Sequence, residues 1–178
     1  MKACILDLRD GAKNFAIKWQ HQFDFMASFD DVSEAPEECN VKIGPPFPTV
    51  SPYTETTRLT GTEYVLVDSK YRQIGPKKVG ECIEKLTISF GLHDTANATS
   101  KVLIAIKKLG ASTLFRPKSI VVYLGNEAPH MENVRSHIQA LGNHATLIVD
   151  SNDIIAGLKN CDLAIGGGGV GMFERASA

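Results

Sequence analysis

The second half of the chain, residues 83–178, alternates short apolar runs with amphipathic stretches, and this alternation constrains the fold more than any other feature. Apolar residues that recur every three or four positions predict helices, and short apolar runs between turns predict strands. A strand–helix unit that repeats implies right-handed crossovers and a parallel sheet with helices on both faces. The predicted strands are 85–90, 119–124, 145–149 and 161–165, and the predicted helices are 95–109, 129–141, 152–158 and 170–178.

The first part of the chain is less regular, because five prolines lie between residues 36 and 52. Proline lacks a backbone N–H and fixes φ, so this stretch is predicted to be mostly loop. The fold class that follows is α/β, with a Rossmann-like parallel sheet over residues 79–178. A partial α/β amino-terminal segment with its linker precedes it over residues 1–78. In that segment we predict strands at 3–8, 25–29 and 63–67, a helix over 12–22 and a linker over 68–80.

Composition excludes several classes of protein. Hydrophobic residues make up 43% of the 178 residues, which is too much for a disordered chain. The net charge is −1, so no global field would attract nucleic acid, and an anionic ligand would need a local site. No apolar run approaches the ~20 residues of a membrane span, and a charge cuts short the apolar run near the amino terminus, whereas a signal peptide needs a longer apolar core, so a cytoplasmic location is expected. The four cysteines are widely spaced, and we expect neither a metal site nor a disulfide framework.

The sharpest local feature is a run of glycines, Gly166 to Gly169 with Gly171 beyond it, between the last predicted strand and the last predicted helix. Glycine backbone can approach a ligand closely, and a helix start adds partial positive charge, so the run predicts a phosphate site. The alternative is a tightly packed or flexible turn, although a plain turn needs only one or two glycines. The run also matches G-x-G-x-x-G, but a dinucleotide site needs an acidic residue about 20 positions further on, and the sequence ends at residue 178.

Two further groups of polar residues are candidates for the same site. Glu174 lies one turn into the last predicted helix, and its carboxylate suits a ribose diol, although it could instead form an ordinary solvated pair with Arg175. Gly91, His93 and Asp94 follow the predicted strand 85–90, and the carboxyl ends of parallel strands share one edge of the sheet. His93 is a candidate base or phosphate donor, or only a surface residue. Asp94 could instead cap the helix that follows.

Several segments resemble one family, the UDP-sugar hydrolases of the pseudaminic acid pathway. Its carboxyl-terminal motif, roughly D-L-x-I-x-x-G-G-x-x-x-x-E-R, is similar to residues 161–178, CDLAIGGGGVGMFERASA. Spore-coat polysaccharide proteins and peptidoglycan N-acetylglucosaminyltransferases share this motif in looser form. The family's S-F-G-G-x-D-x-x-N-x-T segment resembles residues 89–103, SFGLHDTANATSKVL, and its v-x-l-G-x-x-x-P-h segment resembles residues 121–134, VVYLGNEAPHMENV. The stretch that joins the family's two domains is similar to residues 28–46 and 59–72.

The resemblance implies a GT-B arrangement, in which two Rossmann-like domains hold a UDP-sugar between them, with residues 79–178 as the domain that binds the nucleotide. It implies that Gly168 and Gly169 contact the diphosphate and Glu174 the ribose. No cofactor is expected. The expected function is UDP-sugar binding in surface-polysaccharide or nonulosonate biosynthesis. The full set of expected UDP-binding residues is Gly91, Asp94, Gly167, Gly168, Gly169, Val170 and Glu174.

The sequence also departs from that family. The family begins with a G-x-G-H-x-x-R segment whose histidine activates water, and this chain has no such motif. Leu92 stands where the family has a second glycine, and Thr95 where it has a proline. The family's final strand and helices have no counterpart, so a second copy or a partner chain is expected to cover that end. Whether the chain is an enzyme stays open, with His93 as the candidate catalytic residue; the alternatives are a non-catalytic nucleotide-sugar-binding module and a glycosyltransferase-like fragment.

Overall fold

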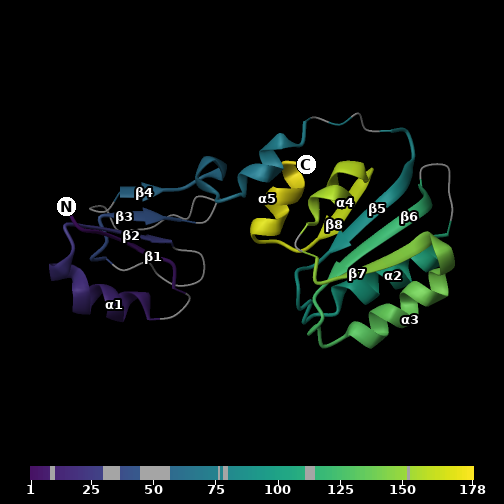
Figure 1. Ribbon diagram of the computed structural model, residues 1–178, viewed down its shortest axis with the longest axis horizontal. Helices are drawn as coiled ribbons and strands as arrows, with labels where there is room; N and C mark the ends of the chain where they lie inside the picture. The colour runs from purple at the N-terminus through teal and green to yellow at the C-terminus, as the bar shows by residue number, and fades with distance from the viewer. Residues whose placement is uncertain are drawn as a thin grey trace. The chain divides into compact units, whose positions relative to one another are not determined.

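A computed structural model describes residues 1–8, 11–29, 37–44, 57–75, 77, 80–110, 115–151 and 153–178. The chain divides into two compact units, Met1–Leu66 and Val67–Ala178. Each unit is α/β, with four described strands in an all-parallel sheet (Figure 1). The predicted fold class, a Rossmann-like parallel α/β arrangement, is therefore confirmed.

The sheet of the first unit has the strand order β1-β2-β3-β4. Helix α1 covers one face of this sheet (Figure 1), and its Ala16 packs against Leu6 and Met26. The elements are β1 (Ala3–Leu6), α1 (Ala12–Trp19), η1 (Gln20–Gln22), β2 (Phe25–Phe29), β3 (Val41–Ile43), β4 (Thr57–Leu59) and η2 (Thr62–Tyr64), where η denotes a 3-10 turn.

Sequence analysis was partly wrong in this unit. The predicted helix over 12–22 ends at Trp19 and continues as a 3-10 turn, and the predicted strand over 63–67 is absent. Residues 62–64 form a 3-10 turn there instead. Strand β3 lies inside the stretch predicted to be loop, and β4 was not predicted. Each of these strands has three residues, which is too short for a periodic pattern to identify, and each depends on pairing with its neighbour. In the same predicted loop, residues 37–40 and 44 lie outside helices and strands, and residues 36 and 45–52 lie outside the described residues.

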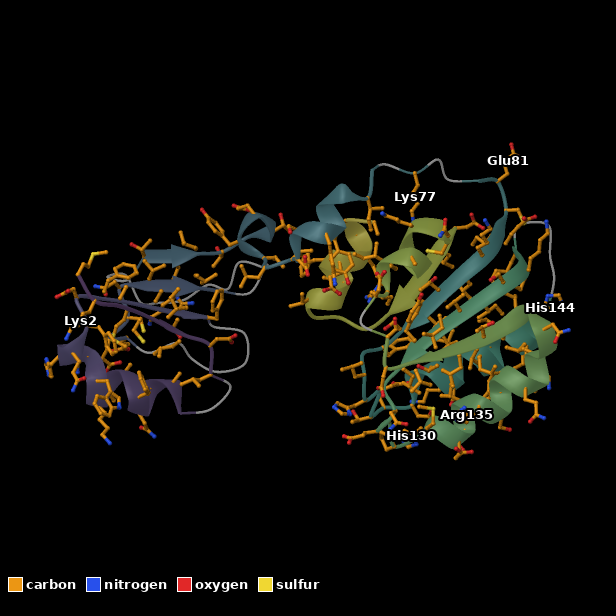
Figure 2. The ribbon with its side chains drawn as sticks, in the orientation of Figure 1. Lys2, Lys77, Glu81, His130, Arg135 and His144 are labelled. Carbon is orange, nitrogen blue, oxygen red and sulfur yellow. The ribbon has the colours of Figure 1, made fainter. Side chains whose placement is uncertain are left out.

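The second unit contains all the predicted strands and helices of residues 83–178, with shifted ends. Helix α2 begins at Ala98 rather than at residue 95, and α3 begins at Met131 rather than at residue 129. Arg135 is exposed on α3 (Figure 2). The elements are η3 (Ser69–Gln73), β5 (Ile83–Ser89), α2 (Ala98–Leu109), β6 (Phe115–Leu124), α3 (Met131–Leu141), η4 (Gly142–His144), β7 (Ala145–Val149), α4 (Ile155–Asn160), β8 (Leu163–Gly166) and α5 (Val170–Ala176).

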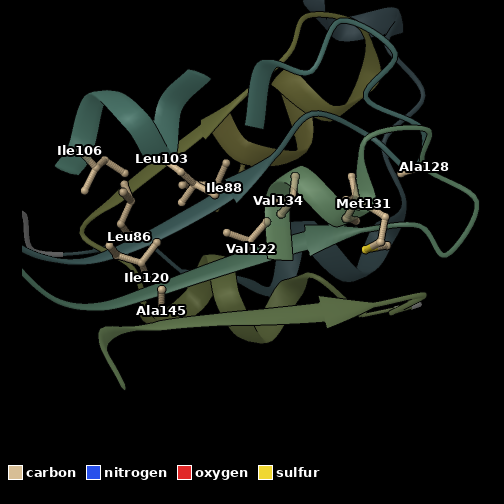
Figure 3. Packing of buried hydrophobic residues seen from close by; sticks show 11 residues of the cluster. Leu86, Ile88, Leu103, Ile106, Ile120, Val122, Ala128, Met131, Val134 and Ala145 are labelled. Atoms are coloured by element: carbon tan, nitrogen blue, oxygen red, sulfur yellow. The ribbon is translucent and has the colours of Figure 1, made fainter. Parts of the chain in front are cut away.

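Helices α2 and α3 cover one face of the second sheet, and α4 packs on the other. Figure 3 shows the core between the sheet and the first two helices, where Leu103 of α2 and Val134 of α3 meet Ile88 and Val122 of the strands. On the opposite face, the hydroxyl of Thr87 donates to the carbonyl oxygen of Gly157 in α4, at 3.0 Å. Adjacent residues of β5 thus point to opposite faces, as strand geometry requires.

The strand order in this sheet is β7-β6-β5-β8. All four strands are parallel, and the order in which they are added to the sheet reverses at β5. From β5 the chain runs outward through β6 to β7, and then returns through α4 to form β8 on the other side of β5. The point where the strand order reverses lies at the carboxyl ends of β5 and β8, which are followed by the loops to α2 and α5. In open parallel sheets, ligands bind at such a switch point.

Residues 67–74 pack with the second unit. The side chains of Tyr71 and Ile74 are buried against Ile155 and Leu158 of α4. Sequence analysis treated residues 68–80 as a linker, because their polar composition hides these two anchors. None of the helices in the described ranges has the length and apolarity that crossing a membrane requires.

Candidate functional site

Two predicted site loops come together at the switch point. The loop after β5 spans residues 90–97, and the loop after β8 spans residues 167–169. Ser89 and Gly166, the last residues of the two strands, are partners in the parallel ladder. The ring of Phe90 lies 3.7 Å from the position that a Cβ on Gly167 would take. The structure therefore places the glycine run beside Gly91, His93 and Asp94, as expected for strands that end at one edge.

Two glycines at this edge are required by packing. A Cβ on Gly166 would collide with the carbonyl oxygen of Ser89 and with the guanidinium of Arg175. A Cβ on Gly125, just after β6, would lie 2.7 Å from the carbonyl oxygen of Leu92. The N–H of Gly125 donates to that same oxygen at 2.9 Å, which anchors the loop after β5 to the end of β6.

Gly168 and Gly169 have different surroundings. Both are exposed, and a Cβ on either would meet no described heavy atom within 4 Å. Gly169 has φ +78°, in the left-handed region that favours glycine. Gly91, with φ +88°, is also exposed and open. Val170, the first residue of α5, is 53% exposed. Among the glycines of the run, 168 and 169 are thus the exposed pair with open Cβ positions.

The guanidinium of Arg175 packs against other glycines of the same run. Its Nη2 donates to the carbonyl oxygen of Gly167, and its Nη1 is 3.4 Å from the Cβ position of Gly171. Partial burial lowers the pKa of the guanidinium, and the charge of nearby Glu174 opposes that shift. Sequence analysis considered Arg175 only as a solvated partner of Glu174. The spacing from Gly171 to Arg175 is one helical turn, and a glycine there leaves room for the arginine side chain.

Glu174 is half-buried and has a partner that the sequence did not indicate. The hydroxyl of Tyr71 donates to the Glu174 carboxylate. Burial of the Tyr71 ring, together with the charge and the hydrogen bond of Glu174, raises the pKa of Tyr71 to about 12. A carboxylate oxygen of Glu174 lies 3.9 Å from the Cβ position of Gly171, so the side chain extends back toward the start of α5. Glu174 is therefore held in place beside the glycine run.

Asp94 serves as a helix cap. Its two carboxylate oxygens accept the N–H groups of Ala98 and Thr99, each at 2.8 Å, and the residue is only 8% exposed. This is the alternative that sequence analysis left open for Asp94. His93 and Leu92 are exposed in the same loop. The structure thus gives Asp94 a structural task and leaves His93 as the accessible acid–base side chain of this loop's described residues.

No protein-family model matches this chain, and no curated protein matches it either. Within the described ranges, histidine, cysteine, aspartate and glutamate side chains do not gather in groups of three that could hold a metal ion. The site itself offers an open glycine pair, the guanidinium of Arg175 on the neighbouring Gly167, and the carboxylate of Glu174 one turn into α5.

Proposed function

We propose that the second unit binds the nucleotide part of a UDP-sugar at the switch point between β5 and β8. In this proposal the diphosphate lies over Gly168 and Gly169, and the ribose meets Glu174. The observation that carries it is the juxtaposition, at the switch point of the parallel sheet, of an open glycine pair with a carboxylate that has a partner in Tyr71. The N–H groups of such glycines suit phosphate oxygens, and a carboxylate accepts the hydrogen bonds of a ribose diol.

The choice of UDP, and of surface-polysaccharide or pseudaminic acid-like biosynthesis, comes from the sequence resemblance described above, and the cytoplasmic location comes from the short apolar runs of the sequence. The glycine run, Glu174 and the segment after β5 are the parts that carry this resemblance. Their meeting at one edge of the sheet supports a common ligand. The edge position of β8 among the described strands leaves room for a second copy or a partner chain, which stays a prediction.

Calorimetric titration with UDP, with NAD as the rival ligand, tests the proposal. We expect UDP to bind and NAD not to bind. Gly169→Asp should weaken UDP binding at least tenfold, because the new carboxylate repels the diphosphate. Gly142→Asp is the matched control, since Gly142 ends α3 with φ +66° and its Cβ position is equally open. Binding of NAD without binding of UDP, or equal losses in the two variants, would overturn the proposal.

A non-catalytic binding module is the second candidate, and the commitment of Asp94 to α2 favours it. Attack of water on a sugar carbon needs a base within about 3 Å of that water. His93 is the accessible candidate in the loop after β5. Release of UDP from a panel of UDP-sugars, compared between the native protein and His93→Ala, separates the two. Turnover that His93→Ala abolishes identifies an enzyme, and tight binding without turnover identifies a binding module.

A further inference from the structure

The glycines from Gly166 to Gly171 fall into two groups according to what surrounds them. Gly166, Gly167 and Gly171 all lie against the guanidinium of Arg175. Gly168 and Gly169 face open space. One part of the run therefore accommodates an arginine side chain, and the other part is available to a ligand. This division explains why the loop needs more glycines than a turn alone would.

The contact between Arg175 and Gly167 has a consequence for the neighbouring amide. The carbonyl group of Gly167 and the N–H of Gly168 belong to the same planar trans peptide, so they point in opposite directions. Arg175 donates to the carbonyl oxygen of Gly167. The N–H of Gly168 therefore points away from the guanidinium, and the Cβ position of the same residue has no described neighbour within 4 Å.

The positive charge of Arg175 also favours an anion at this loop. The guanidinium is half-buried, and none of the ion pairs among the described residues includes it. The loss of water around this cation is reflected in its lowered pKa. An anion bound at the N–H of Gly168 would interact favourably with the guanidinium on the other side of the same peptide, because partly buried charges are screened less than exposed ones.

Resting on the proposed function, we propose that Arg175 is the positioning residue for the diphosphate. It orients the Gly168 amide as a donor and supplies positive charge from behind the loop, while its neighbour Glu174 serves the ribose. Two consecutive residues of α5 would then act on the two halves of one ligand. Arg175 does not need to touch the ligand for this task, since its guanidinium already donates to Gly167.

Titrations with UDP, inorganic pyrophosphate and uridine, each followed by calorimetry, test this division. In Arg175→Gln we expect affinity for UDP and for pyrophosphate to fall at least tenfold and affinity for uridine to stay within threefold. Arg175→Lys keeps the charge and one donor, so it should recover part of the loss. Arg135→Gln is the matched control, because Arg135 is exposed on α3, beside Glu132 at 3.7 Å (Figure 2). It removes the same charge and should leave all three affinities unchanged.

The amide NMR signal of Gly168 gives a second readout that needs no ligand. It should shift in Arg175→Gln, while the signal of Gly142 stays in place. If Arg175→Gln does not fold, Arg175→Lys takes its place in both measurements, and the Gly168 signal should shift there too. Native protein that binds neither UDP nor pyrophosphate overturns the proposed function itself. If the native protein binds both ligands, three results with the variant would overturn the role of Arg175 alone. These are an unchanged affinity for pyrophosphate, equal losses of affinity for uridine and UDP, or an unchanged Gly168 signal.

Discussion

Glu174 and Arg175 are consecutive residues of opposite charge, and they have different partners. Arg175 turns inward to the carbonyl oxygen of Gly167, whereas Glu174 accepts the hydroxyl of Tyr71. A solvated pair of such residues would contribute little, since exposed ion pairs are worth about 0–1 kcal/mol. Here each side chain is half-buried and makes a directed hydrogen bond instead. At the scale of single residues, these two contacts define the candidate site.

The Tyr71–Glu174 contact predicts a pH dependence of stability. Folding raises the pKa of Tyr71 from its usual value of about 10 to about 12, so the native state holds the phenolic proton more tightly than the unfolded state. The resulting stabilisation is complete below pH 10 and is lost as the pH rises from 10 to 12. The free energy of unfolding of the native protein should therefore fall relative to that of Tyr71→Phe, by about 2–3 kcal/mol across this pH range.

Urea unfolding at several pH values between 9 and 12, followed by circular dichroism, measures this difference. The comparison with Tyr71→Phe cancels the contributions of other groups that titrate in the same range. Glu132→Gln removes an exposed carboxylate of α3 and should leave the pH profile as it is. A difference that stays constant up to pH 12 would contradict the proton-holding role of Tyr71.

At the scale of elements, α2 illustrates how a loop residue sets the start of a helix. Asn97 precedes α2 with φ +50°, and its own side chain makes no cap bond. The first N–H groups of a helix have no partner within it. Asp94 supplies that partner for Ala98 and Thr99, from three residues before Asn97. The same loop carries Gly91 and His93 and borders the candidate site.

Replacement of Asp94 should therefore affect stability before it affects binding. We expect Asp94→Ala to lower the free energy of unfolding by about 1–2 kcal/mol, as the loss of a helix cap does. Asp94→Asn keeps one acceptor oxygen, so its free energy of unfolding should lie between those of the native protein and Asp94→Ala. Urea unfolding measures the loss, and titration with UDP below the unfolding transition should show less than a threefold change in affinity. Normal stability combined with lost UDP affinity would instead show that Asp94 acts in ligand binding.

At the scale of the whole molecule, the boundary between the two compact units falls between Leu66 and Val67. The residues just beyond it bury Tyr71 and Ile74 on α4, and Tyr71 also holds Glu174. A segment that looks like a linker in the sequence is thus part of the second unit's core. The candidate site depends on it through Tyr71.

This arrangement predicts different behaviour for two fragments. A fragment of residues 67–178 keeps the anchors, and one of residues 79–178 loses both. Full burial of a large apolar side chain is worth about 1.5–3 kcal/mol, so the shorter fragment should be less stable by about 3–6 kcal/mol. Urea unfolding of the two fragments measures this. Equal unfolding midpoints would show that residues 67–74 do not belong to the core.

The sequence alone determined the fold class and the strands and helices of the second unit. Periodicity records which residues of a segment are buried, and the segments 83–89, 98–109, 115–124 and 131–141 are long enough for a clear pattern. The glycine run is visible in the sequence by composition, and its neighbouring loop could be placed beside it because the turns after parallel strands share an edge. The capping role of Asp94 could be anticipated, since its partners lie within five residues.

Only the tertiary structure decided the partners that are distant along the chain. Tyr71 contacts Glu174 although most of the second unit's sequence lies between them. Strands β3 and β4 form because they pair with their neighbours, since three residues carry no clear pattern of their own. The apolar run at 63–67 looked like a strand, yet residues 62–64 form a 3-10 turn and no partner strand pairs with them among the described residues. Local patterns report how a segment is buried. Which groups then face one another depends on strand order and helix packing, and these place Arg175 behind one half of the glycine run and leave the other half open.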